Sequence, residues 1–108
     1  MTHNTQKAIQ LYNQGVHLFE KEKYDEASAI FQEALRYDPS DSDIFNNLGV
    51  MLFKLNNIEA SIIAFNYAIE LDHTDPRYFN NAGVAYFYLN EEESALEYLR
   101  KAISCDNK

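Results

Sequence analysis

The three glycines of this 108-residue chain, Gly15, Gly49 and Gly83, stand at equal intervals, and this spacing most limits what the chain can fold into. When the sequence is shifted by one such interval, Gly15 aligns with Gly49 and Gly49 aligns with Gly83. Five further columns of identical residues then come into register. These columns are Asn13/Asn47/Asn81, Val16/Val50/Val84, Phe19/Phe53/Phe87, Ala34/Ala68/Ala102 and Asp38/Asp72/Asp106. A fixed period of this length is typical of repeat architectures, in which each unit packs against its neighbours. We therefore divide the chain into residues 8–41, 42–75 and 76–108, with residues 1–7 extending the first helix.

The hydrophobic pattern of each unit predicts two helices. In the second unit apolar residues recur at steps of three and four, first at Phe45, Leu48 and Leu52 and then, after a polar break at 56–57, at Phe65, Ala68 and Ile69. Asp41 and Asp75 are suited to cap helix N-termini, and Pro76 follows at the first helical position, where its missing N–H costs nothing. Pro39 is expected just beyond the end of a helix.

The repeated glycines predict close contact between the two helices of each unit. A glycine within a helix costs roughly 1 kcal/mol relative to alanine, so its recurrence at one position implies a packing reason. The large residues expected to fill the space are Phe31, Phe65 and Leu99, and the repeated small residues are Ala27, Ser61 and Ala95 with Ala34, Ala68 and Ala102.

The sequence resembles the tetratricopeptide repeat family, whose unit has about 34 residues and a pattern of aromatic, Leu-Gly and Tyr followed by Ala, Phe, Ala and Pro. The matching residues are Gly15, Ala27, Phe31, Ala34 and Pro39, then Phe45, Leu48, Gly49, Phe65 and Ala68, and then Phe79, Gly83, Tyr86, Ala95 and Ala102. Departures are Gln14, Ser61, His73 and Asn107, the last two where Pro is usual. The resemblance implies an all-α fold, a right-handed α-solenoid of six antiparallel helices.

The residues offer little for catalysis, and we predict that the protein is not an enzyme and holds no cofactor or metal. His3, His17 and His73 occupy different positions of the repeat, so they are not expected to converge. Cys105 lies beside Asp106, which disfavours a reactive thiolate. The run of glutamates at 91–93 is explained by the dipole of the helix that follows it.

Charge and cysteine content restrict the partners and the compartment. Nine basic and seventeen acidic residues give a net charge of −8, which repels nucleic acid and anionic membranes. A single cysteine allows no internal disulfide, and the N-terminal segment before the first unit lacks the apolar stretch of a signal peptide. No apolar run approaches the length of about 18 residues that a membrane-spanning helix needs, so we expect a cytoplasmic protein.

The resemblance implies a concave groove, lined by the first helix of each unit, that holds a peptide of a partner protein. The predicted groove residues are Tyr12, Asn13, Val16, Asn46, Asn47, Val50, Phe53, Lys54, Arg77, Asn80, Asn81, Val84, Phe87 and Tyr88, with Ile9, Phe19, Glu20 and Asp43 in equivalent slots. Asparagine both donates and accepts, so a row of asparagines can pair with an extended backbone, and the apolar groups favour a ligand with apolar side chains. Alternatively, the Val and Phe residues pack between adjacent first helices.

Some family members bind acidic chaperone tails through a clamp of five basic or Asn side chains. At those five positions Asn47 and Arg77 match the clamp, whereas Tyr12, Val16 and Asn81 do not. Two matches of five disfavour the binding of such tails.

The sequence therefore predicts a protein–protein interaction module of the adaptor or scaffold type. One alternative is self-assembly through an uncapped C-terminal end, where Tyr86, Leu96, Tyr98 and Ile103 would form a homodimer face, because exposed apolar patches usually mark interfaces. A second alternative is a chaperone of the secretion type.

Overall fold

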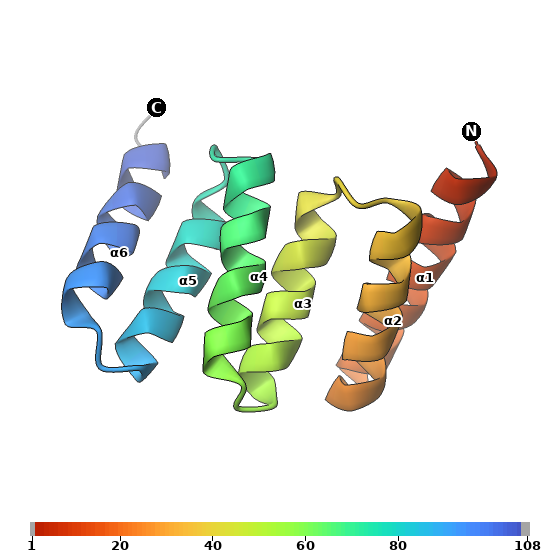
Figure 1. Ribbon diagram of the computed structural model, residues 1–108, viewed down its shortest axis with the longest axis horizontal. Helices are drawn as coiled ribbons and strands as arrows, with labels where there is room; N and C mark the ends of the chain where they lie inside the picture. Colours follow the sequence, from red (N-terminus) through yellow and green to blue (C-terminus); the bar gives the residue numbers. More distant parts are fainter. Residues whose placement is uncertain (1, 107–108) are drawn as a thin grey trace.

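The computed structural model describes residues 2–106, which form six antiparallel α-helices in three successive hairpins (Figure 1). The helices are α1 (His3–Glu20), α2 (Tyr24–Tyr37), α3 (Ser42–Lys54), α4 (Ile58–Leu71), α5 (Pro76–Tyr88) and α6 (Glu92–Asp106). Residues 2–106 contain no strand, so the predicted all-α solenoid is confirmed. Asn107, one of the expected departures from the repeat pattern, lies outside the described residues, as do Met1 and Lys108. No described helix combines the length and the apolar character needed to cross a membrane.

The helix boundaries follow from capping residues. Asp41 Oδ1 accepts a hydrogen bond from the backbone N–H of Ile44 at 3.2 Å, and Asp75 Oδ1 accepts one from the N–H of Arg77 at 2.9 Å. Each carboxylate satisfies a backbone donor that has no partner within its helix. Both predicted N-caps are therefore confirmed, and Pro76 opens α5 as expected.

A residue with positive φ, in the left-handed helical conformation, lies in the turn of each hairpin. Glu22, Asn56 and Asn90 have φ angles of 60°, 65° and 61°, and they occupy the same position in each of the three repeats. Asparagine tolerates this conformation better than most residues, whereas glutamate at the same position carries a conformational cost. The polar break in the hydrophobic pattern thus marks a turn that returns the chain onto its first helix.

Close packing within each hairpin depends on the glycine of the first helix and the large residue of the second. A Cβ atom placed on Gly49 would lie 2.5 Å from Cε1 of Phe65, and one on Gly15 would lie 2.6 Å from Cε1 of Phe31. Both phenylalanine rings are almost fully buried. The aromatic rings occupy the space that a side chain would take, which confirms the predicted reason for the repeated glycine.

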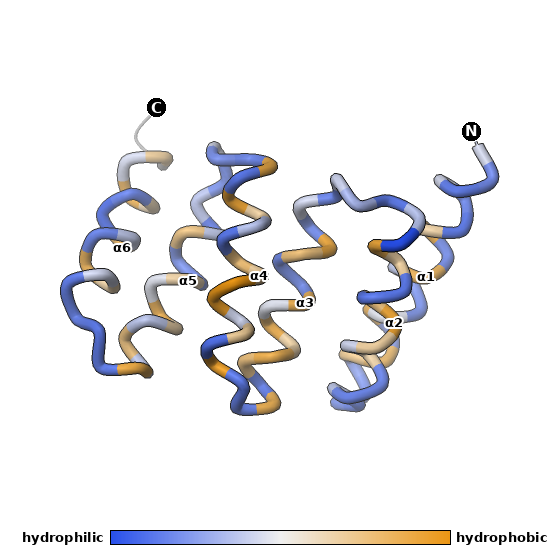
Figure 2. Tube along the Cα trace, viewed as in Figure 1, coloured by the Kyte–Doolittle hydropathy of each residue, from blue (hydrophilic) through white to orange (hydrophobic). Residues whose placement is uncertain are grey.

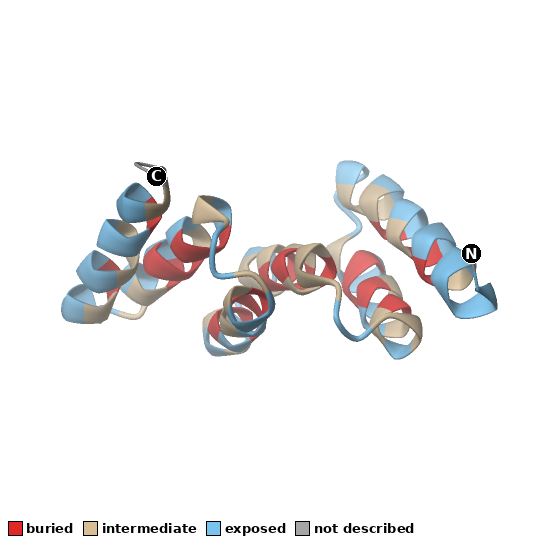
Figure 3. Cartoon of the chain, turned by 90° about the horizontal axis from the view of Figure 1, so that it is seen from above, coloured by how far each residue is buried: buried red, intermediate tan, exposed pale blue. Residues whose placement is uncertain are grey.

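Neighbouring hairpins share a core, because the second helix of one packs on the first helix of the next. The buried apolar side chains on α3 are Ile44, Leu48 and Met51, and those at the same repeat positions of α5 are Tyr78, Ala82 and Ala85. Figure 3 shows buried residues between successive helices and exposed residues on the outer sides of α1 and α6. The hydropathy of the chain alternates along each helix accordingly (Figure 2).

A candidate peptide-binding groove

Asparagine side chains form hydrogen bonds between the first helices of adjacent repeats. Asn47 Nδ2 on α3 donates to the hydroxyl of Tyr12 on α1 at 3.2 Å, and Asn81 Nδ2 on α5 donates to Oδ1 of Asn46 on α3 at 2.9 Å. Both pairs have the same separation along the chain, one position more than the repeat, so the repeat itself places them together. The amide N–H₂ of each asparagine has a partner inside the chain, and the hydrogen bonds of the described residues leave Oδ1 of Asn47 and Oδ1 of Asn81 with lone pairs that can accept from a ligand.

A small pocket lies between α3 and α5. It has a volume of about 130 Å³ and is lined by Val50, Phe53, Phe65, Asn81 and Val84. Phe65 comes from α4, and its buried ring contributes to the lining beneath the two first helices. We call this cavity the groove pocket; its lining is apolar apart from Asn81, and its size suits one aliphatic side chain.

Exposed apolar and aromatic residues continue this apolar surface along α5. Val84 is 39% exposed, Phe87 61% and Tyr88 64%. The ring of Tyr88 meets that of Phe53 edge to face, with centroids 4.9 Å apart. A contiguous patch of exposed apolar side chains marks an interaction surface more often than scattered apolar residues do.

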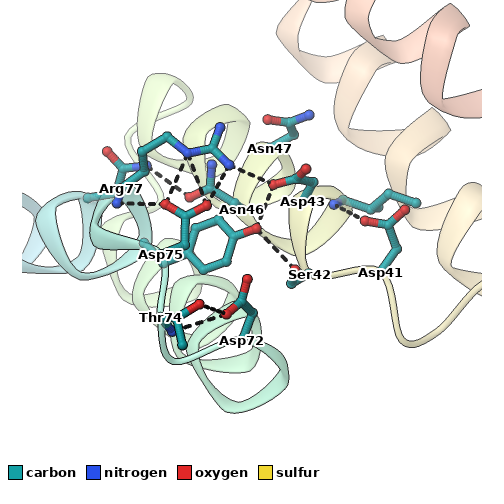
Figure 4. Close-up of polar contacts among 12 residues, drawn as sticks. Asp41, Ser42, Asp43, Asn46, Asn47, Asp72, Thr74, Asp75 and Arg77 are labelled. Atoms are coloured by element: carbon teal, nitrogen blue, oxygen red, sulfur yellow. Dashed lines mark hydrogen bonds and ion pairs between the residues drawn. The ribbon is translucent and has the colours of Figure 1, made fainter. Parts of the chain in front are cut away.

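Two carboxylates pair with the one guanidinium near the N-terminus of α5 (Figure 4). Arg77 Nη2 lies 2.6 Å from Asp75 Oδ2 and 3.0 Å from Asp43 Oδ1. The hydrogen bonds from Arg77 lower the pKa of Asp75, and the same contacts raise the pKa of Arg77. The guanidinium therefore already has two carboxylate partners, with which an acidic ligand would have to compete.

A second hollow, of about 270 Å³, lies between α1 and the start of α3. Its lining includes Ile9 and Tyr12 together with three carboxylates, Asp38, Asp41 and Asp43. Burial raises the pKa of Asp41, and the neighbouring Asp38 and Asp43 raise it further. This end of the groove consequently has a negative potential.

The predicted groove residues differ in how far they face solvent. Asn13, Lys54, Arg77, Asn80, Val84, Phe87 and Tyr88 are exposed, and Tyr12, Val16, Asn47, Val50, Phe53 and Asn81 are partly buried. Asn46 is 6% exposed, because its side chain accepts the bond from Asn81 inside the wall. Asn46 therefore supports the groove and does not face a ligand.

The four residues of the expected homodimer face do not lie together. Leu96 and Ile103 are exposed on α6, at 53% and 61%. The ring of Tyr98 instead packs 4.9 Å from that of Tyr86, and its hydroxyl donates to Asn66 Oδ1 on α4 at 2.8 Å. Both tyrosines belong to the contact between the second and third repeats.

Two residues of this region were not expected from the sequence. Phe65 was expected only as a core residue, yet it also lines the groove pocket. Tyr78 was not singled out, although its buried hydroxyl contacts Asp43 and Ser42 across the repeat junction. The sequence feature that could have indicated Tyr78 is a tyrosine at the position where the preceding repeat has Ile44.

Within residues 2–106, no three His, Cys, Asp or Glu side chains are grouped as metal ligands would be.

Comparison with known proteins identifies the repeat. Residues 12–76 match a family model described as tetratricopeptide repeat, and residues 76–108 match a second model of the same description. No curated protein sequence matches the chain.

Several solved structures have the same fold. The first TPR of Spaghetti (RPAP3), bound to the HSP90 peptide SRMEEVD, is 24% identical, with a TM-score of 0.91 over 95% of this chain and 82% of that one. A T3SS complex from Aeromonas hydrophila is 28% identical, with a TM-score of 0.90 over 94% and 67%. The Yersinia enterocolitica type III secretion chaperone SycD, in complex with a peptide of the translocator YopD, is 25% identical, with a TM-score of 0.87 over 89% and 73%.

Proposed function

Because the chain belongs to the tetratricopeptide repeat family, we propose that it is an interaction module of the adaptor or scaffold type. It binds a peptide segment of a partner protein in the groove formed by α1, α3 and α5. The observation that carries this proposal is the groove pocket, an apolar cavity bordered by exposed Val84. Recognition sites commonly combine such a cavity with a few polar groups that fix orientation.

The ligand that fits this groove is a peptide with an aliphatic side chain and no strong negative charge. The aliphatic group enters the groove pocket, while Oδ1 of Asn47 and Oδ1 of Asn81 accept hydrogen bonds from the ligand backbone. The carboxylates that line the second hollow disfavour an acidic segment and favour a neutral or basic one.

An acidic tail gives a sharp contrast to this expectation. The peptide SRMEEVD bound in the Spaghetti structure carries three carboxylate side chains. In this chain Arg77 is held by Asp43 and Asp75, and Asn81 stands where a second basic residue would be required. We expect no binding of SRMEEVD in calorimetry; an affinity in the low micromolar range would contradict the ligand class proposed here.

The proposal is tested by selecting ligands from a displayed library of random peptides. Selection on the wild-type protein should enrich sequences that share an aliphatic position, and these peptides should bind the Val84→Asp variant at least about tenfold more weakly. Ile63→Asp is the matched control, because Ile63 is 60% exposed on α4 and does not line the groove pocket. If the selected peptides bind Val84→Asp as well as they bind the wild type, the binding site lies elsewhere.

Chaperoning of a secreted protein is a second candidate. The likeness to the SycD complex, whose bound ligand is a translocator peptide, supports testing it. This function also uses the groove, so it is distinguished by the partner: a segment of an exported protein should bind more tightly than library peptides of equal apolar content.

A further inference from the structure

The two ends of the helix array differ in polarity. The first helices of the second and third repeats bury Ile44, Leu48 and Met51, and Tyr78, Ala82 and Ala85, against the preceding hairpin. The same positions of α1 hold Gln10, Gln14 and His17, all exposed. The outer side of α1 is therefore polar at the positions that would pack on another hairpin.

The outer side of α6 keeps the apolar residues of a packing surface. Leu96 and Ile103 occupy the positions that Ile62 and Ile69 occupy on α4. Both of these α4 residues belong to the core with α5, Ile62 buried and Ile69 partly buried, whereas on α6 Leu96 and Ile103 are more than half exposed. Figure 3 shows this outer side of α6 turned toward solvent.

The polarity of α1 argues against stacking of one chain on the end of the next. Such head-to-tail contact would place Gln10, Gln14 and His17 on Leu96 and Ile103, leaving polar groups without partners and leading to an open filament. A two-fold contact, in which the same surface of α6 serves both copies, avoids both problems.

Charges on α6 make this surface complementary to itself. Glu93, Leu96, Arg100 and Ile103 follow one another at steps of three and four and form one stripe, which we call the α6 face. Among the described residues, neither Glu93 nor Arg100 forms an ion pair within the chain. When two α6 helices lie antiparallel and cross beside Leu96, Glu93 of each copy stands opposite Arg100 of the other. A parallel pair would place like charges together.

We propose that the α6 face binds a second copy of this chain in an antiparallel two-fold dimer. Leu96 lies at its centre, and the two Glu93–Arg100 pairs set its orientation. The groove pocket shares no residue with the α6 face, whereas Ile103 lines a hollow together with Arg77 and Asn80 at the start of α5. The proposal does not depend on the groove function.

Sedimentation velocity of the full chain tests the dimer over a concentration series. The 12.5 kDa chain should shift toward a dimer at high micromolar concentration. Glu93→Arg and Arg100→Glu alone should each weaken association about tenfold, because both ion pairs become repulsive. An equimolar mixture of these two variants, and the double variant, should recover it, since opposite charges again face each other.

Two further variants control for the apolar contact. Leu96→Asp should leave a monomer, whereas Ile63→Asp, which alters an equally exposed residue on α4, should dimerise as the wild type does. Circular dichroism verifies the fold of each variant. A wild-type monomer at high micromolar concentration, or single charge variants that associate like the wild type, would overturn the proposal.

Discussion

The hydroxyl of Tyr78 on α5 donates a hydrogen bond of 2.5 Å to Oδ1 of Asp43 on α3, across the junction of the second and third repeats. Burial of the hydroxyl and this bond to a carboxylate raise the pKa of Tyr78 to about 12. Burial also raises the pKa of Tyr98, at the same junction, to about 12. The junction therefore contains two phenols that the folded state keeps protonated.

Alkaline pH should accordingly destabilise the protein through these tyrosines. A folded-state pKa above the ordinary value of 10.0 contributes stability that is fully present below pH 10 and is lost as the pH rises through about 12. Urea midpoints measured across this range should fall less steeply for Tyr78→Phe than for wild type. Tyr88→Phe, which alters an exposed tyrosine, should keep the wild-type slope. If the urea midpoints of wild type and Tyr78→Phe fall equally with rising pH, Tyr78 does not cause the loss of stability.

The glycine contacts predict unequal costs at equivalent positions. Gly49→Ala should destabilise by about 1–3 kcal/mol despite the better helix propensity of alanine, because its Cβ meets the buried ring of Phe65. Gly83→Ala should cost less, since the nearest side chain is Leu99, which is smaller and more flexible than a phenylalanine ring. Denaturant unfolding of both variants gives the comparison, and equal costs would show that the ring is not the obstacle.

Replacing Glu22, which has a positive φ, should stabilise the first hairpin. Glu22→Gly is expected to raise the free energy of unfolding by roughly 1 kcal/mol, because glycine adopts positive φ without the steric cost of a Cβ. The gain at Asn56→Gly should be smaller, as asparagine already tolerates this conformation. Thermal melts of the two variants rank these effects, and a larger gain at Asn56 would contradict the explanation.

The features that could be predicted from the sequence are those repeated in every unit. The period fixes which residues are equivalent, so the contact of Gly49 with Phe65 and the capping by Asp41 and Asp75 follow from local helix geometry. These relationships need no knowledge of how one repeat is placed on the next.

The details that could not be predicted depend on contacts between repeats. Asn46 and Asn47 are neighbours in the sequence, yet the position of α5 buries one and leaves the other partly open. Tyr98 was expected on the uncapped end formed by the last predicted helix, but its long side chain reaches Asn66 on α4. Phe65 reaches the groove pocket because two first helices leave a gap above it.

The asparagines that bridge the first helices should affect both stability and binding. Asn81→Ala removes the hydrogen bond to Asn46 and is expected to cost about 1 kcal/mol of stability, because the partner atom is left partly buried. The combined Asn47→Ala and Asn81→Ala variant should remain folded and should weaken ligand binding by roughly 1–3 kcal/mol. Circular dichroism melts separate the two effects; an unfolded double variant, or one with unchanged affinity, would contradict the groove assignment.

Peptide binding in this groove is tested most directly by calorimetric titration of a library-selected peptide into wild type, Val84→Asp and Ile63→Asp. Val84→Asp should weaken binding at least about tenfold, because a charge enters the rim of the apolar groove pocket, while Ile63→Asp should bind like wild type. Equal affinities of wild type and Val84→Asp, with both proteins folded, would contradict binding in this groove.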